Sequence, residues 1–167
     1  MHQIIVDRLE SIMPTIEKTI DVNVPVNIAY NQWTQFETFP NFMHSVINVR
    51  QLDDTHIWWL AQLGGLAGEC EVEIIDQVPD DHIAWRSVSG ISNAGVVSFQ
   101  HVEQHATRVH IEIEFGSGEM PERVTSIIER KLGEDLQRYR ELLESRKAPA
   151  GGWRGHVSNK TESAVRH

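Results

Sequence analysis

The segment PERVTSIIERKLGEDLQRYRELLES, residues 121–145, decides the fold of this chain. Pro121 stands where the first turn of a helix accepts proline. After it, apolar side chains recur at intervals of three and four residues, which is the spacing of one helical face: Val124, Ile127, Ile128, Leu132, Leu136, Tyr139 and Leu143. The pattern predicts a long amphipathic helix, and its apolar stripe needs a sheet to cover.

A series of strand patterns between residues 46 and 115 supplies that sheet. Clusters of turn residues divide the series: Asp53-Asp54, Gly64-Gly65, Pro79-Asp80-Asp81, Ser89-Gly90 and Gln104-His105-Ala106. Six strands in direct succession predict an antiparallel meander with one apolar face and one solvated face.

The turn positions also predict which residues pair, because side chains alternate between faces with a period of two. Around Gly64-Gly65 we expect Trp59 opposite Cys70 and Ile57 opposite Val72. In the later hairpins the expected pairs are Val97 with Ile113, Phe99 with Ile111, His101 with Val109, Trp85 with Val97, and Ile83 with Phe99. The apolar inner face that results also includes Ile47 and Ser87.

The pattern of the region before the meander predicts one strand and two short helices. Residues 15–24 alternate apolar and polar side chains up to Pro25, and the spacing of Val26, Ala29, Tyr30 and Trp33 is helical. Residues 36–43 are aromatic but contain a proline, which suits a second short helix or a packed loop. One domain over residues 15–146 follows, with an N-terminal extension at 1–14 and a flexible C-terminal tail at 147–167.

Composition excludes several classes of function. The 167 residues carry 15 basic and 24 acidic side chains, a net charge of −9, so nucleic acid and anionic membranes are poor partners. The apolar runs are too short for a transmembrane segment, and the lone Cys70 suits a reducing compartment, so we expect a cytoplasmic protein. The nine histidines show no metal-ligand spacing, and no motif indicates a cofactor.

The order of elements resembles the α+β helix-grip fold, a seven-stranded antiparallel sheet curled around a long C-terminal helix. The chain is similar to the START/Bet v1-like (SRPBCC) superfamily, within it to the bacterial polyketide cyclase/dehydrase branch, and is related to ubiquinone-binding START proteins. The resemblance covers roughly residues 15–146. It rests on Val24-Pro25, Trp33, FETFPNFM at 36–43, VINV at 46–49, PDDHIAWRS at 79–87, NAGVVSF at 93–99 and WRG at 153–155. Cys70 stands where members of this branch carry a tryptophan, which opens space beside Trp59.

The resemblance implies a hydrophobic cavity between the sheet and the long helix. We therefore expect the chain to bind a hydrophobic or aromatic small molecule, such as a polyketide, lipid or quinone. The ligand-binding residues expected from the inner face, the short helices and the helix stripe are Trp33, Phe36, Phe39, Trp59, Cys70, Trp85, Phe99, Ile111, Ile128 and Leu132. For many of these, ordinary core packing is the competing interpretation.

Two further interpretations stay open. In the first, the chain is a polyketide cyclase, aromatase or dehydratase, with His101 as the acid/base group and Ser87 orienting the substrate. In the second, it is a quinone or lipid chaperone that docks on a partner through Trp58 and Leu60. These two residues fall on the outer face and mark either a contact, such as a homodimer interface, or scattered surface apolar residues.

Overall fold

The computed structural model of the chain describes residues 15–63, 66–116, 121–146 and 154–158. Its elements confirm the expected order. They are β1 (Thr15–Val22), α2 (Val26–Trp33), the 3-10 helix η1 (Phe36–Asn41), β2 (Val46–Gln51), β3 (His56–Leu63), β4 (Leu66–Val78), β5 (His82–Gly90), β6 (Asn93–Glu103), β7 (Ala106–Phe115) and α3 (Glu122–Arg146). No described helix combines the length and the apolar character that crossing a membrane requires.

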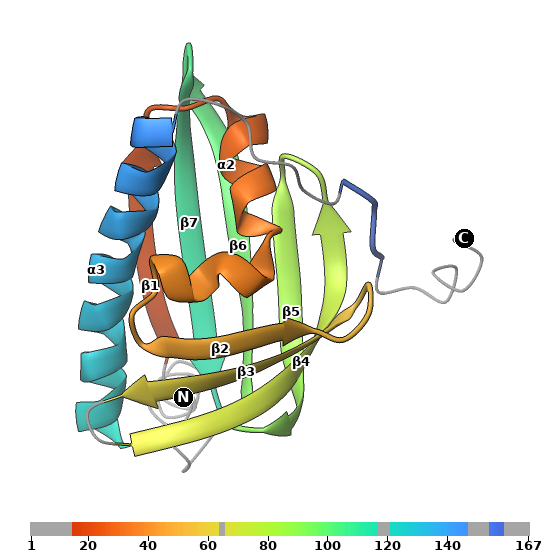
Figure 1. Cartoon of the computed structure of the whole chain (residues 1–167), viewed down its shortest axis with the longest axis vertical. Helices are drawn as coiled ribbons and strands as arrows, with labels where there is room; N and C mark the ends of the chain where they lie inside the picture. Colours follow the sequence, from red (N-terminus) through yellow and green to blue (C-terminus); the bar gives the residue numbers. More distant parts are fainter. Residues whose placement is uncertain (1–14, 64–65, 117–120, 147–153, 159–167) are drawn as a thin grey trace, which may run out of the picture.

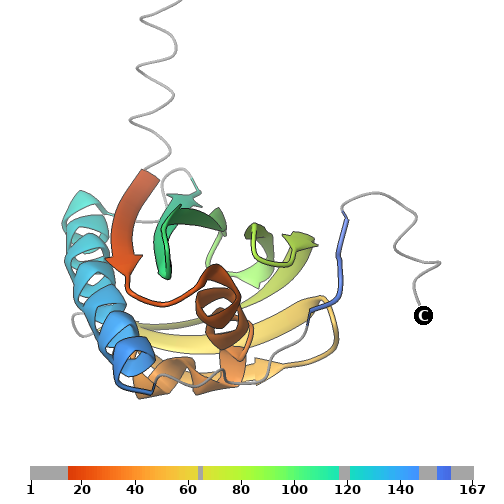
Figure 2. The ribbon, with the colours of Figure 1, turned by 90° about the horizontal axis from the view of Figure 1, so that it is seen from above.

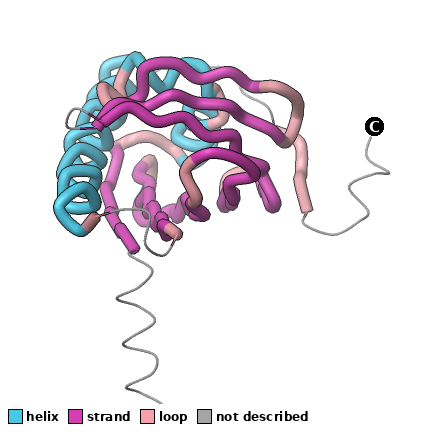
Figure 3. Tube along the Cα trace, turned by 90° about the horizontal axis from the view of Figure 1, so that it is seen from below, coloured by secondary structure: helices cyan, strands magenta, loops and turns pink. Residues whose placement is uncertain are grey.

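The seven strands form one antiparallel sheet in the order β1-β7-β6-β5-β4-β3-β2. The sheet curls strongly, and α3 lies along β1 and closes the open side of the curl (Figures 1 and 2). The helices α2 and η1 lie inside the opening of the curl, as the view from the other end also shows (Figure 3). Irregularities in the β2, β4 and β6 ladders contribute to the bend, because an extra residue on one strand increases its local twist.

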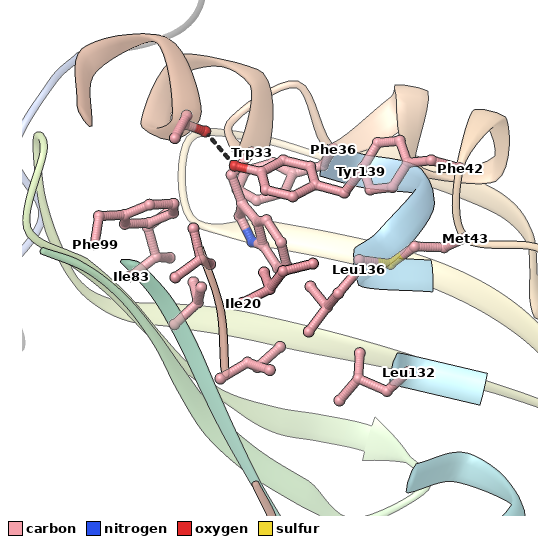
Figure 4. Close-up of a cluster of buried hydrophobic side chains, with 14 of the residues drawn as sticks. Ile20, Trp33, Phe36, Phe42, Met43, Ile83, Phe99, Leu132, Leu136 and Tyr139 are labelled. Carbon is pink, nitrogen blue, oxygen red and sulfur yellow. Dashed lines mark hydrogen bonds between the residues drawn. The ribbon is translucent and has the colours of Figure 1, made fainter. Parts of the chain in front are cut away.

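Aromatic side chains join the helices to the sheet. The Trp33 ring meets those of Tyr139 and Phe99 edge to face, at centroid distances of 5.2 and 6.2 Å. The buried Tyr139 hydroxyl donates a hydrogen bond of 2.7 Å to the Ala29 carbonyl, drawn as a dashed line in Figure 4. Burial raises the pKa of Tyr139 well above its usual value, so the hydroxyl keeps its proton and remains a donor.

Some predicted registers are confirmed and others are wrong. Trp59 lies opposite Cys70 and Ile57 opposite Val72, as expected. The other two hairpins are displaced by two residues. The pairs are Val97 with Ile111, Phe99 with Val109, His101 with Thr107, Ile83 with Val97, and Trp85 with Gly95.

The cause of the β6–β7 difference is the turn. Gln104 and His105 form a two-residue connection with His105 at a φ of 69°, and the ladder shifts register between His101 and Glu103. A displacement of two residues leaves each side chain on the same face. The inner face is therefore largely as predicted, although the pairs across it are not.

Ile47 is a correction to the expected inner face. The β2 ladder is irregular between Val46 and Asn48, so Val49 is buried while Ile47 is 47% exposed on the outside. Regular alternation had placed Ile47 and Val49 on the same face, and the irregularity separates them.

Part of the expected tail is docked on the domain. Gln77 and Val157 exchange backbone hydrogen bonds of 2.6 and 2.8 Å in an antiparallel bridge, and Val157 is buried. The Arg154 guanidinium forms an ion pair of 2.8 Å with Asp80 and lies 5.5 Å from the centroid of the Tyr30 ring. The composition of residues 147–167 had predicted a flexible tail, and for residues 154–158 the structure corrects this expectation.

Candidate functional site

A cavity of about 190 Å³ lies between the curled sheet, η1 and the first half of α3. Six strands, β2 to β7, contribute side chains to its wall, and α3 contributes part of its apolar stripe. Residues that line it include Val49, Ile57, Ala61, Val72, Ile74, Ile83, Ile113 and Phe115 from the strands, and Met43 from the loop between η1 and β2. The wall is almost entirely apolar, which is typical of a site for a hydrophobic small molecule.

The cavity brings together most of the residues expected to bind ligand. Those in the wall are Trp33, Phe36, Phe39, Trp59, Cys70, Trp85, Ile111, Ile128 and Leu132. Phe99 is absent from this wall. It is buried behind it, with its ring edge-to-face against Tyr30 and Trp33.

The two candidate catalytic residues do not reach the cavity. His101 is exposed near the end of β6, beyond the buried part of the strand. Ser87 is half-buried, and its hydroxyl accepts a hydrogen bond of 3.0 Å from the backbone N–H of Asn93. Neither residue is part of the cavity wall, so the expected inward position of both is wrong: His101 lies beyond the buried part of β6, and the Ser87 hydroxyl is bonded to the Asn93 backbone.

The sheet side of the wall contains a buried polar residue that the sequence did not single out. Asn93 is 6% exposed, and its Oδ1 accepts a hydrogen bond of 3.0 Å from the Trp85 indole N–H. Its Nδ2 donates to the Ile91 carbonyl at 2.9 Å and to Cys70 Sγ at 3.7 Å. The amide thus fixes the Trp85 ring and the Cys70 side chain, two neighbours in the wall.

Cys70 behaves as a small apolar residue in this setting. Burial raises the pKa of its thiol to about 11, against the smaller opposing effect of the Asn93 hydrogen bond. Because the thiolate is the nucleophilic form, the side chain is unreactive near neutral pH.

A second cluster of polar side chains lies where residues 42–45, the η1–β2 segment, meet α3. Ser45, Lys131 and Asp135 all line the cavity there. Asp135 is 4% exposed, accepts a hydrogen bond of 3.1 Å from the His44 backbone N–H, and forms an ion pair of 2.6 Å with Arg138. Burial raises the pKa of Asp135, while Arg138 and the His44 N–H oppose this shift. The contact attaches the η1–β2 segment to the helix.

The helical spacing contained a signal for these two α3 residues. Ile128, Lys131 and Asp135 are separated by three and four residues, so both polar side chains lie on the edge of the apolar stripe. Ser45 gave no comparable signal, because its position depends on how the loop meets the helix.

Two surface features lie apart from the cavity. Trp58 and Leu60 are half-buried on β3, opposite Glu71 and Glu69 of β4, and their role in a homodimer or docking contact stays a prediction. Among the residues that the structure describes, Glu17, His110 and Glu112 bring donor atoms within 4.8 Å of one another. Both carboxylates are exposed, and none of the three lines the cavity.

Comparison with known proteins identifies the family. Residues 22–138 match the family model described as polyketide cyclase/dehydrase and lipid transport. An uncharacterised 17.2 kDa protein from the melC2-rnhH intergenic region of Streptomyces lincolnensis is 40% identical over 149 residues, which cover 87% of this chain and 99% of that protein.

Solved structures share the fold at lower identity. The Zhui aromatase/cyclase from Streptomyces sp. R1128 is 14% identical with a TM-score of 0.70, over 84% of this chain and 99% of that one. A START superfamily protein from Mycobacterium smegmatis is 14% identical with a TM-score of 0.63, over 79% and 95%. These similarities confirm the helix-grip fold. The chain belongs to the polyketide cyclase/dehydrase and lipid transport family.

Proposed function

We propose that this protein binds one hydrophobic or aromatic small molecule, such as a polyketide, lipid or quinone, in the cavity between the sheet and α3. The observation that carries the proposal is the cavity itself, with its volume of about 190 Å³ and its almost wholly apolar wall. Three tryptophan and three phenylalanine side chains face it.

Protein interiors are normally packed without space of this size. Voids larger than a water molecule are few, and each costs stability because the lining atoms lose contacts. An apolar cavity of about 150 Å³ stays dry and binds benzene. A cavity of this size and polarity therefore suits a ligand at least as large as one aromatic ring.

The alternative is a cyclase, aromatase or dehydratase that acts in the same cavity. It draws support from the family description. The residues expected to supply its acid/base chemistry, His101 and Ser87, lie outside the wall. Binding without catalysis is therefore the function that the geometry favours.

Titration with N-phenyl-1-naphthylamine tests the proposal, since this neutral dye fluoresces strongly in apolar surroundings. Val49→Phe adds an aromatic ring at a buried position in the cavity wall, whereas Ile47→Phe adds the same ring two residues away on the exposed side of β2. We expect saturable one-to-one binding to the wild type and to Ile47→Phe. We expect Val49→Phe to weaken binding by about tenfold or more, since the new ring occupies the ligand volume.

Circular dichroism and thermal melting check that both variants are folded. Dye binding to folded Val49→Phe with wild-type affinity would contradict the cavity assignment. The absence of saturable binding to the wild type would contradict the proposed function itself.

A further inference from the structure

The few polar side chains in the cavity wall differ in whether the protein supplies them with hydrogen-bond or ion-pair partners. On the sheet side, the Asn93 amide already donates to Ile91 and Cys70 and accepts from Trp85. On the α3 side, Asp135 is held by Arg138 and by the His44 N–H. Neither group needs a hydrogen bond from a ligand.

Lys131 and Ser45 differ from these groups. Within the described ranges, no carboxylate lies within ion-pair distance of the Lys131 ammonium, and the side chain is half-buried at the cavity. Ser45 is 9% exposed, and its hydroxyl has no hydrogen-bond partner among the same residues. The cavity therefore has one cation and one hydroxyl donor that are free to act on a ligand.

The fold places these two donors at the same end of the cavity. The hydrogen bond from the His44 N–H to Asp135 brings the residue before Ser45 into contact with α3. Lys131 precedes Asp135 by one helical turn on the same face. Both donors therefore lie where the η1–β2 segment meets the helix, and the remaining wall is apolar or internally satisfied.

We infer that the ligand is an amphipathic monoanion whose carboxylate-like head is received by Lys131 and Ser45 while its apolar body fills the cavity. The inference rests on the proposed function and adds the chemical class of the ligand. An apolar group lying against Lys131 would remove water from the ammonium without replacing its hydrogen bonds, which is unfavourable, and a single neutral oxygen would replace them only in part. An anionic head replaces that water with charge-assisted bonds, which are about twice as strong as neutral ones.

The net charge of the whole protein shows why the positive charge of Lys131 matters for the choice of ligand. With a net charge of −9 the molecule repels anions in general. Selection for an anionic ligand must therefore come from the cation in the wall.

Competition between two ligands with the same chain tests the inference. Decanoate and 1-decanol share an alkyl body and differ in the charge of the head, and each is used near neutral pH to displace N-phenyl-1-naphthylamine. We expect decanoate to displace the dye from the wild type at about tenfold lower concentration than 1-decanol, the scale of one charge-assisted hydrogen bond.

Variants assign the preference to the two donors. Lys131→Met keeps the length of the side chain and removes its charge, so it should abolish the preference for decanoate while 1-decanol binds as before. Lys131→Arg should retain the preference, and Ser45→Ala should reduce it by about threefold. Arg130→Met, which removes an exposed cation of α3 outside the cavity, should leave it unchanged.

The outcomes separate this inference from the proposed function. If the wild type binds the dye but shows no preference for decanoate, or if Lys131→Met keeps the preference, the anionic head group is disproved and the cavity remains a binding site. If the wild type binds neither the dye nor 1-decanol, the proposed function fails as well.

Discussion

Asn93 connects β6 to the cavity wall through a single buried amide. The residue lies directly after Ser89-Gly90-Ile91-Ser92, a context in which asparagine usually serves a turn. Its role depends instead on Trp85 and Cys70, which belong to two other strands and reach it only in the folded sheet. The local sequence therefore could not indicate the contact, although it did indicate both of its partners.

Replacing Asn93 tests the contribution of this amide to stability. Asn93→Ala removes the acceptor of the Trp85 indole N–H and leaves that half-buried donor unpaired. We expect the free energy of unfolding to fall by about 1–3 kcal/mol. Urea denaturation measures it, with Asn48→Ala as the control because Asn48 is exposed on β2. Equal stability of the two variants would show that the amide does not hold the wall.

At the scale of elements, the sequence predicts the type and order of the strands and helices well. The apolar stripe of α3 and the alternation in each strand follow from periodicity, which packing against one core enforces. The pairing across β5–β6 and β6–β7 was wrong because a shift of two residues preserves the same inner face. In β6–β7 the true register is set by a two-residue turn and a ladder irregularity, and neither leaves a mark in the pattern of apolar residues.

The segment 154–158 is the element that composition described least well. Its glycine-rich surroundings indicated a tail, yet Val157 is buried and bridges Gln77. The partner strand lies about 80 residues earlier in the chain. Such a long-range contact cannot be read from local composition.

Truncation tests this docked segment. Deleting residues 154–167 removes two backbone hydrogen bonds, the buried Val157 side chain and the Arg154–Asp80 ion pair. We expect a loss of about 2–3 kcal/mol of stability, mostly from Val157, since full burial of a valine contributes about 1.5–3 kcal/mol. Deleting only residues 159–167 keeps these contacts and serves as the control. If both truncated proteins have the same melting temperature as the wild type, the segment does not stabilise the domain.

For the whole molecule, the apolar part of the site was predictable and the polar part was not. The inner-facing aromatic residues line the cavity because a curled sheet and one covering helix must enclose them, so inward position alone identified most of the wall. Lys131 and Ser45 meet the cavity only through the contact of the η1–β2 segment with α3. That contact is set by tertiary packing.

The central claim is that the ligand lies inside this cavity, and intermolecular nuclear Overhauser effects from bound N-phenyl-1-naphthylamine test it most directly. We expect contacts from the ring protons of the dye to the methyl groups of Ile57, Ile83 and Leu132, which line the cavity. The exposed methyl groups of Ile47, Leu52 and Val88 serve as the surface reference. Contacts to these surface methyl groups, with none to the cavity, would contradict the account.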